Sequence, residues 1–262
     1  MLISGEVKPG FESVRDLFQR SLSPARDKNV QLCVYVGEER VVDLWASSGD
    51  DRFSADSLVN VFSSGKSIES ILMGALVDQG LLDFTQPVST YWPEFVGDGK
   101  DAMTVADVMR HEAGLAQLEV SLSATQLETS ALKQNSVGRI LEKHPLSFPE
   151  GSSPREYHAV TRGWIVNEIF RRIEPGQRTM GEFLREQISE PLGIDVYFDI
   201  NADEADRLSR VQPRGLMSQL LDSFAPVHRR AGSALRLSNC LSERGEFWRQ
   251  RLAIGAPRWP YR

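Results

Sequence analysis

The residues of this chain that are best suited to catalysis begin with a serine and a lysine three positions apart. Residues 60–82 read NVFSSGKSIESILMGALVDQGLL, which places Ser63 and Lys66 at this spacing. If Ser63 opens a helix, both side chains lie on one face near its first turn. A serine hydroxyl is a weak nucleophile that needs a nearby base, and a lysine amine can be that base. The pair predicts a nucleophile for acyl transfer, with the alternative that Ser63 only caps the helix.

The spacing alone does not single out this pair. Ser130 and Lys133 have the same separation, but they lie in a polar segment, ETSALKQNS, typical of a solvated surface. Only Ser63 follows a strand-like run and opens a long amphipathic segment. Ser64 is a neighbouring candidate, although its offset from Lys66 turns it away on a helix. We therefore expect the chemistry at Ser63.

The apolar spacing predicts the elements that position this pair. The chain is expected to open with a helix over residues 9–22, followed by two strands that form a hairpin around GEER at residues 37–40. The helix after Ser63 is expected to stop at Gly80. A compact loop or short turns are expected over residues 83–95. Further helices are predicted at residues 104–114, around 136–143, after 156, and from 180 to just before Pro191.

The composition indicates an ordinary globular protein. Of 262 residues, 41% are hydrophobic and 25% charged, and no apolar run is long enough to span a membrane. The first twenty residues lack the pattern of a signal or transit peptide, so a cytoplasmic location is expected. The net charge of −6 gives no reason to expect nucleic acid as a partner. Cys33 and Cys240 are too few for a disulfide framework, and Cys33 is expected to be a buried thiol in its strand.

Four ordered motifs together resemble one family. They are VFSSGKSIESILMGALVDQGLLDFTQPVSTYWPEF, MTVADVMRHEAGL, EYHAVTRGWIVNEIFRRI and FLREQISEPLGI. They are similar to the class C β-lactamase-related serine hydrolases, especially the esterase-like branch, over about residues 5–222. The resemblance implies an α+β fold of the β-lactamase/transpeptidase type: an antiparallel sheet flanked by helices, with a helical region over roughly residues 64–200. It also implies hydrolysis of small-molecule esters or amides through an acyl-enzyme, without a cofactor.

The resemblance also assigns roles to residues. Ser63 matches the nucleophile, Lys66 its partner base, and Tyr157 the tyrosine of the second motif, which shares the proton transfers. His158 and Ser64 are the expected substrate-binding residues. Many relatives have asparagine where this chain has Ala159, and the Tyr-His pair fits the esterase-like branch better than a β-lactamase. The alternative is that Tyr157 and His158 only cap and pack a helix.

Two other signals are weaker. His111 and Glu112 match half of a zinc-protease helix, but Leu115 occupies the position of the second histidine, so no metal site is expected. The resemblance implies that this segment forms a turn beside the active-site cleft, with a packing role for His111. No serine lies in a G-x-S-x-G elbow, which excludes an α/β-hydrolase site.

The last part of the sequence departs from the family pattern. The expected third motif, a Lys-Thr-Gly or its His/Trp-Gly-Gly counterpart, is not found, and Arg230-Ala231-Gly232 is the nearest imitation. Residues 225–262 hold eight arginines, no lysine or aspartate and two glutamates. We expect a family domain over residues 1–224 that lacks its C-terminal strands, and a divergent tail over 225–262. The alternative function is a truncated, non-catalytic member that acts by protein contacts or not at all.

Overall fold

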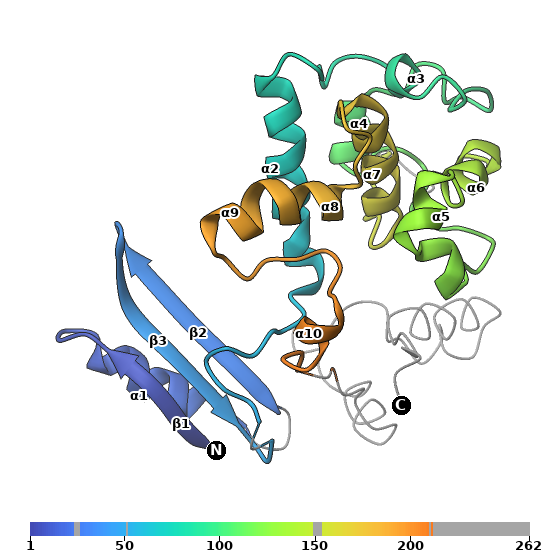
Figure 1. Cartoon of the computed structure of the whole chain (residues 1–262). Helices are drawn as coiled ribbons and strands as arrows, with labels where there is room; N and C mark the ends of the chain where they lie inside the picture. Colours follow the sequence, from blue (N-terminus) through green and yellow to red (C-terminus); the bar gives the residue numbers. More distant parts are fainter. Residues whose placement is uncertain (24–26, 51, 149–153, 210, 212–262) are drawn as a thin grey trace. The chain divides into compact units, whose positions relative to one another are not determined.

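The computed structural model describes residues 1–23, 27–50, 52–148, 154–209 and 211. The chain divides into two compact units (Figure 1). Unit 1 comprises residues 1–60 and 200–212, and unit 2 comprises residues 61–199 and 213–262. The arginine-rich tail, the triplet Arg230-Ala231-Gly232 and Cys240 lie outside the described residues.

Unit 1 holds a three-stranded antiparallel sheet with a helix against it. Its elements are β1 (Leu2–Val7), α1 (Glu12–Ser21), β2 (Asn29–Val36), β3 (Glu39–Ser47) and the short α10 (Ala202–Ala205). The strand order is β1-β3-β2. Phe18 of α1 is buried with residues of β3, namely Val41, Val42, Leu44 and Ala46. The predicted first helix and the hairpin are confirmed.

Two expectations for unit 1 were wrong. The chain opens with β1 and not with a helix. The prediction missed this strand because it carries a glycine and only a short alternating pattern. Its pairing with β3 stabilises it. Cys33 is exposed and not buried. Successive side chains of a strand point to opposite faces, so Leu32 and Val34 pack on the cluster around Phe18 while Cys33 faces away.

Gly5 lets β1 approach β3 closely. Its φ is +98°, and a Cβ atom there would lie 2.0 Å from the carbonyl oxygen of Asp43. Gly5→Ala is expected to lower the free energy of unfolding by ~3 kcal/mol or more, since it adds left-handed strain and a backbone clash. Gly10→Ala is the matched control, because Gly10 has φ +92° with no atom within 4 Å of its Cβ position. Urea unfolding followed by circular dichroism measures both, and equal losses would contradict the close-approach explanation.

Unit 2 is helical in its described part. Its elements are the 3₁₀ turns η1 (Phe62–Ser64) and η2 (Ala124–Leu127), the π-helical stretch η3 (Arg185–Ser189), and the α-helices α2 (Gly65–Asp78), α3 (Val88–Tyr91), α4 (Val105–Met109), α5 (Thr129–Lys133), α6 (Gly138–Lys143), α7 (Thr161–Ile173), α8 (Met180–Leu184) and α9 (Glu190–Leu192). Among the residues that the structure describes, no helix is long and apolar enough to cross a membrane.

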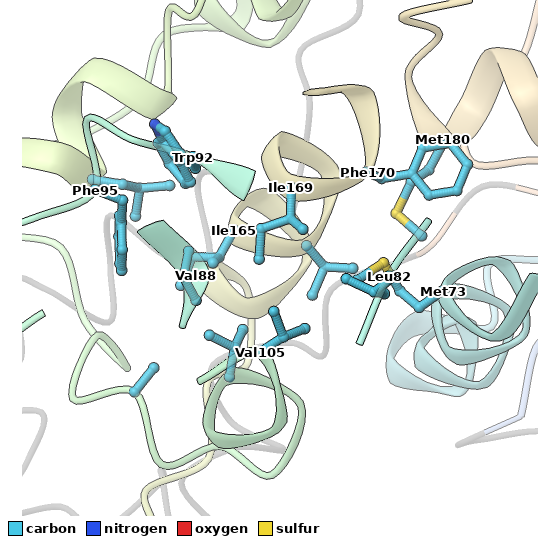
Figure 2. Close-up of a cluster of buried hydrophobic side chains, with 14 of the residues drawn as sticks. Met73, Leu82, Val88, Trp92, Phe95, Val105, Ile165, Ile169, Phe170 and Met180 are labelled. Carbon is cyan, nitrogen blue, oxygen red and sulfur yellow. The ribbon is translucent and has the colours of Figure 1, made fainter. Parts of the chain in front are cut away.

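The core of unit 2 forms around α2 and α7. Met73 of α2 and the fully buried Ile165 and Ile169 of α7 lie in one apolar cluster. In Figure 2 the two isoleucines of α7 lie between Val88 and Val105 on one side and Met73 on the other. This packing fixes α2, and therefore its first turn, against α7.

Three further local predictions were wrong. The run before Ser63 is not a strand. Among the described residues it forms one isolated β-bridge, between Leu58 and Leu208 within unit 1. The helix from Thr104 ends at Met109, well before Gly114, after a capping box with Asp107. The last predicted helix does not stop before Pro191: η3 shifts the hydrogen-bond ladder just ahead of this proline, and α9 continues to Leu192.

Candidate active site

Ser63 and Ser64 lie on the 3₁₀ turn that leads into α2. Both side chains are exposed, and the preceding residue, Phe62, has φ +47°, in the sparsely populated left-handed region. Ser64 is the N-cap residue of α2, and Val61 is the N-cap residue of η1. The alternative that Ser63 serves as the helix cap is therefore wrong.

Lys66 lies in the first turn of α2, and its side chain is directed to a distant segment of the chain. Its Nζ atom donates a hydrogen bond of 2.9 Å to the carbonyl oxygen of Ala159. The same nitrogen lies 5.1 Å from the centroid of the Tyr157 ring. The structure thus brings together Lys66 and Tyr157, two of the residues singled out in the sequence, although they come from opposite halves of the chain.

Tyr157 lies in an irregular segment before α7 and not at the opening of a helix, since α7 begins at Thr161. Its side chain is 53% exposed. The segment is attached to the turn that follows α4: the Glu156 N–H donates to the His111 carbonyl at 3.0 Å, and the Arg155 guanidinium pairs with Glu112 at 2.7 Å. The expected packing role of His111 is confirmed by its ring, whose centroid lies 4.8 Å from that of Tyr157.

His158 points into the protein and is fully buried. Its Nε2 atom accepts the Leu115 N–H at 3.0 Å, and Nδ1 lies 2.6 Å from the Glu156 carbonyl oxygen. Because Nε2 accepts, the proton is assigned to Nδ1, which donates to that carbonyl. Both ring nitrogens are thus engaged by the backbone, an arrangement suited to fixing the segment around Tyr157.

The electrostatic surroundings of the site are positive. The pKa of His111 is lowered from 6.5 to about 4, first by burial and then by the positive charges of Arg162, Lys66 and Arg155. His111 is therefore neutral at pH 7. On α2, burial raises the pKa of Glu69 above its ordinary value, although the charges of Arg162 and Lys66 act in the opposite direction.

Arg162 of α7 supports the turn that carries Lys66. It is 6% exposed, donates to the Lys66 carbonyl oxygen at 3.1 Å and to the Ser70 hydroxyl at 3.3 Å, and forms an ion pair with Glu69 at 3.3 Å. Gly163 follows it, and a Cβ there would lie 3.0 Å from a Glu69 carboxylate oxygen. The ion pair of Arg162 with Glu69 therefore joins the start of α7 to the first turns of α2.

Breaking this pair is expected to destabilise the protein. Arg162→Met at pH 7 leaves Glu69 buried without its partner and should cost ~3–5 kcal/mol of unfolding free energy. Adding Glu69→Gln removes the uncompensated charge and should restore more than ~1 kcal/mol. Urea denaturation of the single and double variants measures this coupling. A double variant no more stable than Arg162→Met would show that the charge pair is not the cause.

Sequence reasoning missed Arg162 and Glu69. The available signal was that each is a charged residue among the apolar residues of an amphipathic helix. The apolar spacing alone places such a residue at the edge of the buried face and does not predict its partner.

The competing pair of Ser130 and Lys133 lies on the surface, where the Lys133 ammonium on α5 pairs with Glu182 at 2.9 Å. Within the described residues, no group of three or more histidine, cysteine, aspartate or glutamate side chains could hold a metal ion.

The chain is similar to known proteins in both sequence and structure. The family model described as Beta-lactamase matches residues 15–225. The chain is 32% identical over 201 residues to esterase/beta-lactamase LipL of Mycobacterium tuberculosis (strain ATCC 25618 / H37Rv), a match that covers 74% of this chain and 44% of LipL.

Two solved structures are similar over most of the chain. A penicillin-binding protein homologue from Caulobacter crescentus matches with a TM-score of 0.70 and 31% identity over 90% of this chain and 65% of its own. A family VIII carboxylesterase matches with a TM-score of 0.69 and 29% identity over 81% of this chain and 58% of its own. The fold is thus of the predicted β-lactamase/transpeptidase type, and the chain spans less than half the length of LipL.

Proposed function

Because the chain belongs to the beta-lactamase family, we propose that it is a serine hydrolase that cleaves ester or amide bonds of small molecules through an acyl-enzyme on Ser63. The observation that carries this proposal is the position of the Lys66 amine. It lies in the helical turn next to Ser63, is held by the Ala159 carbonyl and lies beside the ring of Tyr157. Acyl transfer through a covalent intermediate requires a nucleophile with a base close by, and the amine and the phenol are the groups here that can move its proton.

The proposed reaction has two halves. In the first, the Ser63 hydroxyl attacks the substrate carbonyl while its proton passes to the Lys66 and Tyr157 pair, and this pair then returns the proton to the departing alcohol or amine. In the second, water attacks the ester formed on Ser63, and the same groups move its proton so that the carboxylic acid is released and the hydroxyl is regenerated.

The roles of the two remaining candidates differ. Ser64 is exposed next to Ser63 and keeps its proposed contact with the substrate. For His158, full burial and two backbone partners support a role in positioning its neighbour, Tyr157, in place of direct contact with the substrate.

The proposal is tested by labelling with a fluorophosphonate probe and mapping the modified peptide by mass spectrometry. We expect one adduct on Ser63, absent from Ser63→Ala and retained in Ser64→Ala. Turnover of p-nitrophenyl butyrate and of nitrocefin, measured on the same variants, separates esterase from β-lactamase activity. Equal labelling of wild type and Ser63→Ala would overturn the proposal. A folded chain with neither labelling nor turnover would favour the non-catalytic alternative.

A further inference from the structure

We propose that His111 and His158 form a bracket of two neutral imidazoles that holds Tyr157 against Lys66, which makes His111 a positioning residue for the reaction. This inference rests on the proposed function for its catalytic consequence, because Tyr157 acts there as a proton carrier. The structural part of the bracket can be tested without any activity.

The first half of the bracket is His111, which holds the chain on both sides of Tyr157. Its carbonyl oxygen accepts the Glu156 N–H at 3.0 Å, and its Nδ1 atom accepts the His158 N–H at 3.1 Å. Its ring also packs on Tyr157, with a centroid distance of 4.8 Å and an interplanar angle of 52°. Because one residue anchors both neighbours of Tyr157 and touches its ring, the phenol has little freedom to turn away from the amine of Lys66.

The second half of the bracket is His158, which holds the segment of Tyr157 from its buried side. It links the Leu115 N–H to the Glu156 carbonyl through its two ring nitrogens, and its ring centroid lies 5.7 Å from that of His111. Each hydrogen bond that ends on an imidazole nitrogen, at His111 Nδ1 and at His158 Nε2, requires that nitrogen to be unprotonated. Protonating either ring would set a ring N–H against a backbone N–H and open the bracket.

Burial and the positive charges nearby keep His111 neutral at pH 7, because together they lower its pKa to about 4. Burial contributes most to this shift, and the positive charges of Arg162 on α7, Lys66 on α2 and Arg155 on the segment of Tyr157 add to it. The acid that follows His111 in the sequence, Glu112, is paired with Arg110 and Arg155. The bracket should therefore be intact at pH 7 and open as the pH falls through about 4.

Two substitutions separate the hydrogen bond from the ring contact. His111→Phe keeps an aromatic ring beside Tyr157 but cannot accept the His158 N–H. His111→Asn loses the ring, but its side-chain oxygen can accept at the position of Nδ1, and asparagine tolerates the φ of +65° found here. The control is His144→Phe, because His144 also accepts a backbone N–H, from Glu119 at 3.0 Å, away from Tyr157.

The experiment measures hydrogen exchange at the His158 amide by NMR, together with kcat and KM for p-nitrophenyl butyrate. We expect His111→Phe to speed this exchange at least tenfold and to lower kcat about tenfold with KM within twofold of wild type. His111→Asn and His144→Phe should stay near wild type in both. In wild type, protection of the His158 amide, corrected for the intrinsic exchange rate, should fall between pH 6 and pH 3.5 while protection of the core amide of Ile169 remains.

The results can overturn the bracket independently of the proposed function. Unchanged His158 protection in His111→Phe, or unchanged protection in wild type down to pH 3.5, would overturn it. If His111→Phe does not fold, the pH series on wild type still decides. Wild type that shows no labelling of Ser63 removes the proposed function alone, since the exchange measurement does not depend on catalysis.

Discussion

Replacing Lys66 with methionine is expected to lower kcat/KM for p-nitrophenyl butyrate by ~10²–10⁴, the usual contribution of a positioned acid–base group. Methionine keeps an unbranched side chain of similar length, so the packing against α7 and the Tyr157 segment is largely retained. What is lost is the amine that is held by Ala159 and lies beside Tyr157. Steady-state kinetics and the rate of fluorophosphonate labelling should fall together.

Lys133→Met is the matched control for this experiment. Lys133 stands at the same spacing from Ser130, but its amine pairs with Glu182 on the surface. It should therefore keep wild-type kinetics and lose at most ~1 kcal/mol of stability. If Lys66→Met retained wild-type kinetics, or if both variants lost activity equally, Lys66 would not be the base.

Tyr157→Phe is expected to lower kcat by ~10²–10⁴ with a small change in KM. Phenylalanine keeps the ring that packs on His111 and lies beside the Lys66 amine, so only the phenolic hydroxyl is removed. The loss should therefore appear as slower chemistry and not as unfolding, and the thermal midpoint should stay within about 2 °C of wild type, a difference of less than ~1 kcal/mol.

Tyr35→Phe is the control for Tyr157→Phe, because Tyr35 is 60% exposed on β2 of unit 1 and Tyr157 is 53% exposed. Both substitutions remove one hydroxyl from an exposed tyrosine, so a difference in kcat between them measures the effect of the site. A Tyr157→Phe variant with full kcat would restrict the proton transfers to Lys66. A variant that lost activity only through a raised KM would assign Tyr157 to substrate binding.

The behaviour of the buried charges follows from the same packing. Arg162 and Glu69 are taken out of water together, and their interaction orients the carbonyl of Lys66 as well as joining two helices. The backbone of the proposed base, Lys66, is thus held by the ion pair of Arg162 with Glu69, which takes no part in the proposed reaction. Substitutions in that pair should reduce stability first, and activity through the position of α2.

Local sequence determined several of the elements and the main motif of this protein. The apolar spacing after Ser63 specifies α2, the sequence Thr104 to Asp107 specifies a capping box, and the two β-rich runs specify a hairpin. These features depend on neighbours a few residues apart, so a single sequence carries them. The family resemblance then indicated which serine, lysine and tyrosine belong together.

Only the tertiary structure decided which side chains meet and which face water. β1 has a weak pattern of its own and exists through its partner β3, while Cys33 is exposed because the sheet packs on its other face. The pairing of Arg162 with Glu69, and the attachment of Tyr157 to His111, join segments far apart in the chain. No local pattern encodes such contacts, because they form only once segments far apart in the chain have packed together.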